Sequence, residues 1–259
     1  MIKKKIYSVI NQKGGVGKTT TTINLGTAMA ACDAKVLLID MDPQGNLSTG
    51  LGVPPINRAT GIYNILTSNK KIQDCLVKTE IPNLDLVTAN NDLLGVEIEL
   101  SSSDDRALRL KKALEGVNNY DFILLDCPPA LNIITLNALA ASDGALVPLQ
   151  AEFYALEGLS QLLKTIKSIS LTVNSRLKLS GVVLTMFDKR NNLSVQVEED
   201  VRGYLGEDVF LTKIPRNIRL SEAPSHGLPA LIYDHKCTGS KAYIDLAREF
   251  LEREGWKFK

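Results

Sequence analysis

Paired cysteines are missing from this 259-residue chain, which has four cysteines and no C-x-x-C pair. Such wide spacing argues against a zinc or iron–sulfur site built within one subunit. We therefore expect reduced, buried thiols at all four positions. These positions are Cys32, Cys75, Cys127 and Cys237.

Histidine, net charge and long apolar runs are also scarce. The two histidines, His226 and His235, have no partner at metal-ligand spacing, so we expect both in loops or on the surface. A net charge of +1 predicts neither a nucleic-acid binder nor an acidic surface, so any DNA binding must come from a local basic patch. No apolar run approaches the roughly 20 residues of a membrane helix. No signal-peptide core follows the charged start at residues 1–5, which indicates a cytosolic protein.

Short apolar runs do occur, and they alternate with amphipathic stretches along nearly the whole chain. Near-continuous apolar strands separated by helices are typical of a parallel sheet covered on both faces. There is no internal repeat, low-complexity tract or linker, and an apolar content of 44% suffices for one large core. We therefore predict a single α/β domain over residues 1–259, with a mostly parallel sheet flanked by helices on both faces. The expected strands are residues 6–10, 36–39, 84–87, 122–125, 145–147 and 181–184.

Apolar residues at steps of three and four predict two helices clearly, at residues 156–166 and 243–251. The second of these is expected to begin near Ser240. A further helix-like stretch spans residues 19–31. The serines and aspartates of residues 101–105 supply N-cap acceptors and predict a helix start there.

The most informative segment is Asn11–Thr20, NQKGGVGKTT, which follows the first expected strand and opens a helix. Glycines let backbone N–H groups turn inward, and a helix N-terminus adds a positive field, so the segment can bind phosphates. The usual pattern has glycine where this chain has Gln12, and this chain has a second lysine, Lys13. The predicted nucleotide contacts here are Lys13, Gly14, Gly15, Val16, Gly17, Lys18, Thr19 and Thr20.

Lys18 and Thr19 have the ordinary roles in such a loop. The ammonium of Lys18 is expected on the terminal phosphates and the hydroxyl of Thr19 on Mg²⁺. Asp126 ends an apolar strand, where a carboxylate can hold Mg²⁺ through its water shell. An acid that only ends a strand is the plainer alternative, and the neighbouring phosphate loop argues against it.

Two more acids, Asp40 and Asp42, follow the second strand. Alternation along an extended chain places them on the same side. Since phosphoryl transfer requires a positioned water, we assign Asp42 to orienting the attacking water and Asp40 to the Mg²⁺ neighbourhood. A plain turn would also explain the composition, but not its position at the carboxyl end of a strand, where α/β sites form.

These segments, together with Asp126-Cys-Pro-Pro, resemble the deviant Walker A ATPases of the ParA/MinD group. Residues 150–158 (QAEFYALEG) and 214–224 (IPRNIRLSEAP) resemble its ParA/Soj branch, which partitions chromosomes and plasmids. The resemblance runs from about Lys5 to about Leu251. It implies a Rossmann-like P-loop fold and an ATPase that uses ATP and Mg²⁺.

The resemblance also implies partners. Family members form a homodimer around two ATP molecules, with the lysine matching Lys13 reaching the partner's nucleotide, and with Pro215 and Asn217 against the adenine. It further implies non-specific binding to double-stranded DNA, a nucleoid-associated location, and release when a ParB/Spo0J-like protein stimulates hydrolysis. Because the phosphate loop starts at residue 11, we expect no N-terminal helix-turn-helix domain. We also expect no membrane partner, because only residues 254–259 follow the last expected helix.

DNA contact is expected in the segment from Arg176 to Arg219, which contains eight basic and six acidic residues. Joining two subunits would double this small excess, so DNA affinity should depend on ATP and fall with salt. Without a helix-turn-helix, the contacts should go to phosphates. The residues expected to make them are first Arg216 and Arg219, then Lys189 and Arg190.

Three alternatives remain open. A MinD-like membrane switch would need a basic amphipathic helix beyond the core, and only residues 254–259 follow the last helix. An iron–sulfur reductase related to nitrogenase iron protein would need cysteines near the dimer axis, where only Cys127 adjoins a nucleotide motif. A nucleotide-gated assembly protein without useful hydrolysis is disfavoured by the pair Asp40 and Asp42.

Overall fold

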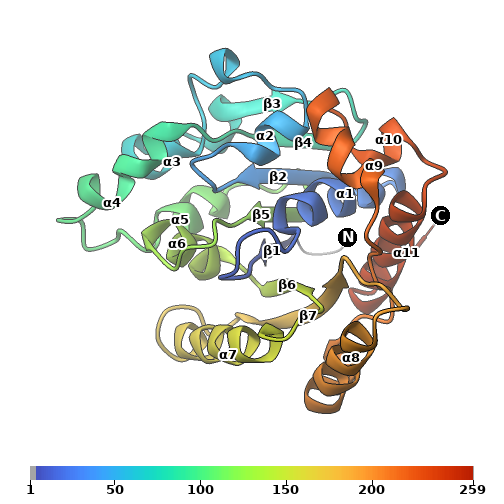
Figure 1. Cartoon of the computed structure of the whole chain (residues 1–259). Coiled ribbons are helices and arrows are strands. Elements are labelled where there is room, and N and C mark those ends of the chain that lie inside the picture. Colours follow the sequence, from blue (N-terminus) through green and yellow to red (C-terminus); the bar gives the residue numbers. More distant parts are fainter. Residues whose placement is uncertain (1–3, 259) are drawn as a thin grey trace.

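A seven-stranded sheet forms the centre of the computed structural model, which describes residues 4–258 (Figure 1). The strand order is β3-β4-β2-β5-β1-β6-β7, and only the β3–β4 pair is antiparallel. The strands are β1 (Lys5–Val9), β2 (Val36–Asp40), β3 (Leu76–Lys78), β4 (Leu84–Val87), β5 (Phe122–Asp126), β6 (Gly144–Gln150) and β7 (Lys178–Thr185). All six predicted strands and the mostly parallel sheet are confirmed, and β3 is an edge strand that was not predicted.

Helices cover both faces of this sheet. They are α1 (Lys18–Ala31), α2 (Asn46–Gly50), α3 (Ile62–Ser68), α4 (Val96–Glu99), α5 (Arg109–Glu115), α6 (Ile133–Ala141), α7 (Ala155–Thr172), α8 (Asn192–Leu205), α9 (Ile218–Glu222), α10 (Ala230–Tyr233) and α11 (Thr238–Arg253). The short 3₁₀ turns are η1 (Pro55–Asn57), η2 (Ile72–Cys75), η3 (Asn91–Gly95), η4 (Gly206–Asp208) and η5 (Ala223–His226).

Strand alternation divides the buried side chains into two apolar layers. On β5, Phe122 and Leu124 face one layer, while Ile123 and Leu125 face the other. The first layer lies under α1 and α11, and the second lies under α3, α5, α6 and α7. Figure 1 shows the resulting three-layer arrangement, with α1 and α11 on one side of the sheet and α5, α6 and α7 on the other.

The three predicted helices are confirmed as α1, α7 and α11. The helix start predicted at residues 101–105 is wrong, because these residues form turns and α5 begins only at Arg109. The carboxylate of Asp105 bonds Arg109 and Lys112 rather than capping a helix at this point. Ser103 Oγ also donates to Asp105 Oδ1, at 2.6 Å, so the expected capping groups bond each other instead.

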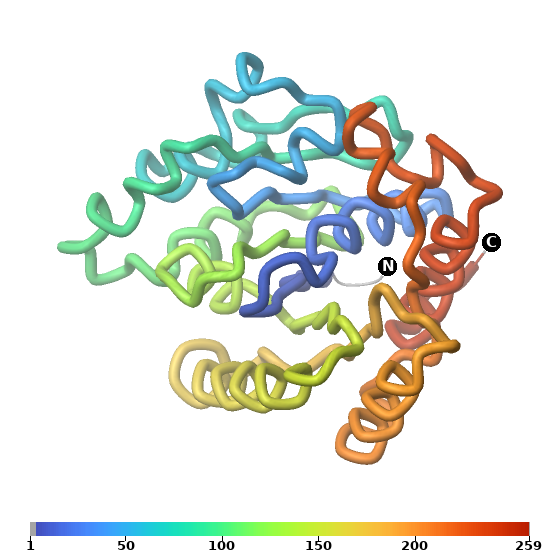
Figure 2. Tube along the Cα trace, in the orientation of Figure 1, coloured from blue at the N-terminus to red at the C-terminus, as the bar shows by residue number. Residues whose placement is uncertain are grey.

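The parallel register brings three predicted site segments to one edge of the sheet. Val9, which ends β1 just before the phosphate loop, is paired with Asp126, and Asp40 is paired with the same residue from the other side. Figure 2 shows the loop after β1, in dark blue, at this carboxyl end of the strands. Adjacent carboxyl ends are where ligand sites of open α/β sheets form.

The first and last described segments meet at the amino end of β1, opposite the end that carries the phosphate loop. Lys5 on β1 forms an ion pair with Glu254, which follows α11. The ring of Trp256 packs against Phe122, at 5.7 Å between centroids. Trp256, in the short segment after α11, is therefore packed on the core rather than available to a membrane-binding tail. No helix within residues 4–258 combines the length and the apolar character needed to cross a bilayer.

The cysteines are free thiols: Cys75 and Cys127 are buried as expected, but Cys32 and Cys237 are only half-buried. Both histidines are exposed, as predicted.

Candidate functional site

The phosphate loop has the backbone shape that its glycines predict. Gly15 and Gly17 adopt φ values of +74° and +89°, in the left-handed region that favours glycine. A Cβ placed on Gly14 or Gly15 would meet no atom within 4 Å, so the loop borders open space. Helix α1 starts at Lys18 with neither a side-chain cap nor an acidic residue in its first turn, among the residues described. Its first N–H groups can therefore bind an anion.

The ammonium of Lys18 is buried beside this loop. The residue is 8% exposed, and its Nζ donates to the carbonyl oxygen of Lys13 at 3.0 Å. Burial lowers the pKa of Lys18, and the nearby carboxylate of Asp126 opposes that shift. A buried cation needs an anionic partner, and a bound phosphate fits that need.

Two fully buried carboxyl groups end the neighbouring strands β5 and β2, and the one on Asp126 acts on Lys18. Asp126 accepts hydrogen bonds from Thr19 Oγ1 at 2.7 Å and Thr22 Oγ1 at 3.2 Å. Asp40 accepts from the backbone N–H and the hydroxyl of Ser48, at 2.9 and 2.7 Å. Burial and then the charge of Asp40 raise the pKa of Asp126 to about 8, while burial raises the pKa of Asp40 to about 6. The two acids thus form a pair that a nearby cation would stabilise.

The donor set fits magnesium. The structure brings together Thr19, Asp40 and Asp126, the three predicted metal residues, through the β2–β5 register and the Thr19–Asp126 hydrogen bond. Within residues 4–258 no group of three or more His, Cys, Asp or Glu side chains is placed to hold a metal by itself. All three residues offer oxygen, and Mg²⁺ is commonly bound through one or two carboxylates together with phosphate and water. This site therefore suits Mg²⁺ that arrives with a nucleotide.

Replacing Asp126 by Asn should stabilise the nucleotide-free, Mg²⁺-free protein. Because the pKa of Asp126 is raised on folding, its contribution to stability is full below the unfolded pKa of about 4 and is lost as pH rises through about 8. An asparagine at this position would keep one acceptor for Thr19 or Thr22 without the charge. We expect Asp126→Asn to melt at least about 4 °C higher at pH 8 in EDTA, and the difference to shrink at pH 5. A melting temperature below wild type at pH 8 would contradict the assignment.

Asp42 lies in a turn directly after β2. Its Oδ1 accepts the N–H of Gln44 at 2.9 Å, and the N–H of Gly45 donates to the Asp42 carbonyl at 2.9 Å. The side chain is half-buried, and its Oδ2 has no hydrogen-bond partner within the described chain. Asp40 Oδ1 accepts the N–H of Asp42 at 3.2 Å, so the two acids are held in one segment. One carboxylate oxygen of Asp42 is therefore available to accept a proton or a hydrogen bond from water.

Lys13 points away from the space beside Lys18. Its Nζ forms an ion pair with Glu152, just after β6, and its side chain remains half-exposed. Its N–H donates to Asn11 Oδ1 at 3.0 Å, which fixes the backbone of the loop. The two lysines of the loop thus face different surroundings, one buried at the phosphate space and one at the rim.

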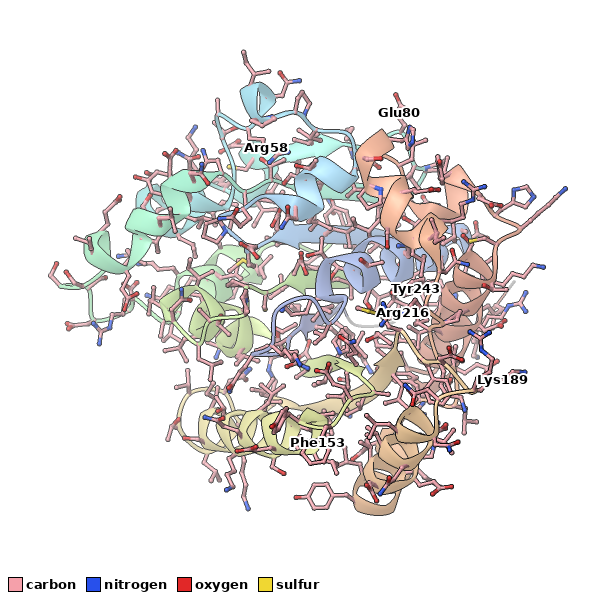
Figure 3. All side chains as sticks on the ribbon, in the orientation of Figure 1. Arg58, Glu80, Phe153, Lys189, Arg216 and Tyr243 are labelled. Carbon is pink, nitrogen blue, oxygen red and sulfur yellow. The ribbon has the colours of Figure 1, made fainter. Side chains whose placement is uncertain are left out.

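Pro215 and Asn217, predicted to contact the adenine, line a cavity of about 240 Å³ next to the phosphate loop. Gly17 and Thr20 also line it, so the cavity is continuous with the loop. Its other walls come from β7, the segment before α9, and α11, and they include Arg216 and Tyr243 (Figure 3). Asn217 Nδ2 donates to Thr238 Oγ1 at 2.9 Å, which orients the amide at the cavity's edge.

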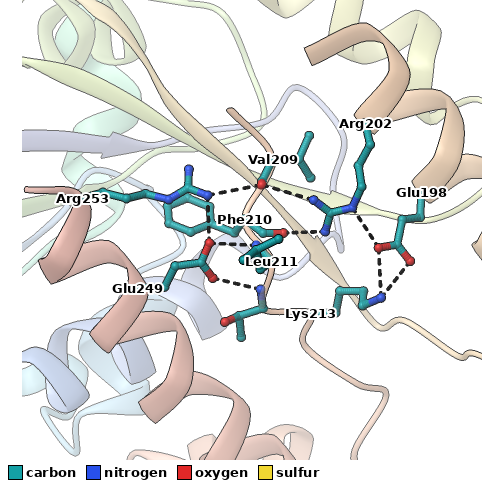
Figure 4. A network of polar contacts seen from close by, with 9 residues as sticks. Glu198, Arg202, Val209, Phe210, Leu211, Lys213, Glu249 and Arg253 are labelled. Atoms are coloured by element: carbon teal, nitrogen blue, oxygen red, sulfur yellow. Dashed lines mark hydrogen bonds and ion pairs between the residues drawn. The ribbon is translucent and has the colours of Figure 1, made fainter. Parts of the chain in front are cut away.

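A polar network holds the segment that leads to this cavity (Figure 4). Glu249 on α11 accepts the N–H groups of Leu211 and Thr212, at 2.7 and 2.9 Å. Arg202 on α8 donates to the Phe210 carbonyl at 2.8 Å. The segment also runs beside β7, through Phe210 N–H to Val182 O and Ile214 N–H to Leu184 O. The position of Pro215 therefore depends on α8, α11 and β7 together.

Two of the four residues predicted to contact DNA are engaged in ion pairs, and the other two are not. Arg190 forms a two-point ion pair with Asp188, and Arg219 pairs with Glu222 and Asp234. Lys189 and Arg216 are exposed and have no ion pair within residues 4–258.

Other basic residues in the same region are also neutralised. Arg202 and Lys213 both bind Glu198, and Arg176 pairs with Asp143. A count of charges along the sequence therefore overstates the number of free cations. Of the four predicted contacts, only Lys189 and Arg216 are without an ion pair in the described part of the chain.

Sequence reasoning missed several side chains around this site. Glu152 lies in the segment 150–158, and its ion pair with Lys13 joins two segments that are distant in the sequence. Thr185, Met186 and Tyr243 line the cavity, but their types carry no nucleotide signal.

Known proteins match this chain over nearly its whole length. Residues 4–179 match a protein family described as "AAA domain". Chromosome partitioning protein ParA of Caulobacter vibrioides is 54% identical over 253 residues, which cover 96% of this chain and 95% of that protein. Sporulation initiation inhibitor protein Soj of Bacillus subtilis is 50% identical over 246 residues, covering 95% of this chain and 97% of that protein.

A solved structure also matches. Cobyrinic acid a,c-diamide synthase from Mycobacterium smegmatis, with bound ATP analog and magnesium, has a TM-score of 0.85 and 35% identity to this chain, and the match covers 95% of this chain and 93% of that one.

Proposed function

Because this chain belongs to the ParA/Soj-type chromosome-partitioning ATPases of the ParA/MinD family, we propose that two copies close around two ATP molecules and that only this closed dimer binds DNA. One observation carries the proposal: the buried ammonium of Lys18 lies in a glycine loop beside two buried carboxyl groups. Hydrolysis of ATP to ADP and phosphate then returns the protein to the form that releases DNA. The continuous sheet supports treating residues 4–258 as one ATPase domain.

ATP and Mg²⁺ fit the residues at this site. The N–H groups from Gly14 to Thr20 face the triphosphate, and Lys18 neutralises its terminal charge. The base enters the cavity lined by Pro215 and Asn217. Thr19 and Asp126, together with Asp40, which is paired with Asp126 in the sheet, would hold Mg²⁺, and the ion would neutralise charge on the phosphate oxygens. Asp42 orients the attacking water through its free oxygen.

In the closed dimer, each subunit supplies a second cation to the nucleotide of the other. Lys13 contacts Glu152 in its own chain and does not face the space beside Lys18. We assign its ammonium to the nucleotide of the second copy, where a cation stabilises charge that develops during phosphoryl transfer. A ParB/Spo0J-like partner stimulates hydrolysis, and the protein is nucleoid-associated while it holds ATP.

The deciding experiment measures DNA binding with ATP, with ADP and without nucleotide, over a salt series. We expect binding only with ATP, and a steep fall in affinity as salt rises, since phosphate contacts release counterions. Equal DNA affinity in all three nucleotide states would refute the proposal. A protein that stays monomeric with a non-hydrolysable ATP analogue would refute it as well.

Arg216→Ala should weaken this DNA binding more than Arg190→Ala does. Arg216 has no ion pair among residues 4–258, whereas the charge of Arg190 is already compensated by Asp188. Loss of one phosphate contact per subunit should reduce the slope of log affinity against log salt by about 2 in the dimer. Because Arg216 also lines the cavity, ATP affinity must be measured in parallel. Equal losses for both variants would contradict the ranking.

A further inference from the structure

Arg58 is a buried cation outside the nucleotide site. The residue is 5% exposed and follows η1, where its N–H donates to the Pro55 carbonyl at 3.1 Å. Its own carbonyl accepts from Asn90 Nδ2 at 3.3 Å. Its backbone is therefore fixed on both sides, and its side chain extends back toward α2 (Figure 3).

Within residues 4–258, all hydrogen bonds from this guanidinium go to neutral oxygens. Nε and one terminal nitrogen donate to the Val53 carbonyl, the same terminal nitrogen donates to Thr49 Oγ1 at 2.8 Å, and the other donates to the Gly45 carbonyl at 3.1 Å. Burial lowers the pKa of Arg58, and the nearby carboxylate of Asp40 opposes that shift, so the charge acting on this cation belongs to the same segment as Asp42.

Gly45 connects Arg58 to Asp42. The N–H of Gly45 closes the turn onto the Asp42 carbonyl at 2.9 Å. The Gly45 carbonyl accepts from Arg58 at 3.1 Å and also from the N–H and the hydroxyl of Thr49, at 2.9 and 3.1 Å. Gly45 adopts φ +64°, and a Cβ at this position would overlap the Arg58 guanidinium. The guanidinium therefore packs directly against the glycine that closes the turn with Asp42.

Arg58 also contacts α2, the helix that carries the residue bound to Asp40. Thr49 lies on α2, one residue after Ser48, whose N–H and hydroxyl bind Asp40. Arg58 thus fixes both ends of the stretch from Gly45 to Val53, and this stretch bears directly on the turn with Asp42.

We infer that Arg58 is a positioning residue for hydrolysis: its guanidinium holds the Gly45 carbonyl and thereby fixes the turn that places the Asp42 carboxylate. The inference rests on the proposed water-orienting role of Asp42. Arg58 lies outside the cavity and the phosphate loop, so it acts on the chemical step rather than on nucleotide binding. A displacement of about 1 Å at a reacting group can cost about 100-fold in rate.

The test compares Arg58→Lys, Asp42→Ala and the double variant in full-length protein. Lysine keeps the charge but loses the forked donor geometry. We expect Arg58→Lys to lower the single-turnover hydrolysis rate about tenfold, with affinity for a fluorescent non-hydrolysable ATP analogue within about threefold of wild type. The double variant should be as slow as Asp42→Ala, because residues that act through one another are not additive. Arg106→Lys, at an exposed arginine, is the matched control and should leave rate and affinity unchanged.

Three results would overturn the inference. The first is an Arg58→Lys hydrolysis rate within about twofold of wild type, and the second is a loss of affinity for the ATP analogue as large as the loss of rate. The third is a double variant that is slower than Asp42→Ala by the full factor seen in Arg58→Lys. If Arg58→Lys does not fold, Thr49→Val removes the hydroxyl that accepts from Arg58 and donates to the Gly45 carbonyl. We expect about a threefold loss for this variant, with the same non-additivity with Asp42→Ala. Asp42→Ala with normal turnover would instead refute the role of Asp42 itself. A slow Asp42→Ala beside a normal Arg58→Lys would refute the inference alone.

Discussion

Lys13→Ala should abolish ATP-dependent dimer formation and leave binding of ATP to the single subunit largely intact. The reason is that Lys18, not Lys13, is buried at the phosphate space, whereas the ammonium of Lys13 lies at the rim against Glu152. Removing Lys13 leaves the helix N-terminus and Lys18 in place for the nucleotide. The variant lacks only the ammonium that we assign to the triphosphate of the second subunit. We expect no dimer by light scattering with a non-hydrolysable ATP analogue, at concentrations where wild type is fully dimeric.

Two further variants make this result specific to Lys13. Lys167→Ala removes an exposed lysine on α7 and should dimerise normally. Glu152→Gln frees Lys13 from its ion pair, so this variant should dimerise at least as well as wild type. Affinity for a fluorescent ATP analogue should fall less than about tenfold in Lys13→Ala. Normal dimers in Lys13→Ala would show that the second lysine has no role between subunits.

Much of the sheet could be predicted from the sequence because its strands are buried on both faces. Runs such as Phe122–Leu125 are fully apolar, and this run ends at a polar residue that marks the carboxyl edge. The edge strand Leu76–Lys78 has three residues that are all at least partly exposed, and it gives no such signal. Helix α6 was missed because Ile133–Ala141 is almost entirely apolar and buried, which leaves no amphipathic stripe.

The candidate site at the carboxyl ends of the strands was predictable for a different reason. A parallel sheet brings the carboxyl ends of neighbouring strands together, so Asp40 and Asp126 had to lie near the phosphate loop once the strands were known. Contacts that depend on tertiary structure were not predictable. Arg58 lies in a polar stretch with no motif, and its role depends on the close approach of Gly45. The pairing of Arg190 with Asp188 likewise removes a cation that the sequence counts as free.

Asp42→Ala should reduce ATP hydrolysis by about 100-fold or more and trap the ATP-bound dimer on DNA. Asp42 Oδ1 is engaged with the N–H of Gln44, while its Oδ2 has no hydrogen bond within residues 4–258 and can hold a water. Nucleotide binding should persist, because Lys18 and Thr19 lie on a separate segment. Phosphate release, measured with DNA and a ParB-like partner present, tests the expected decrease. The lifetime of the dimer after ATP is diluted should lengthen correspondingly.

Asp42→Asn separates the charge from the shape of the turn. An amide oxygen at this position can still accept the Gln44 N–H, so the turn closed by Gly45 is retained while the negative charge is removed. We expect Asp42→Asn to be nearly as slow as Asp42→Ala, because the carboxylate rather than the turn orients and polarises the water. Gln44→Ala, which changes only an exposed neighbour, should hydrolyse ATP normally. Full activity in Asp42→Asn would assign Asp42 to holding the turn, and the acceptor for the water would then have to be Asp40, whose oxygens already accept from Ser48 and Asp42.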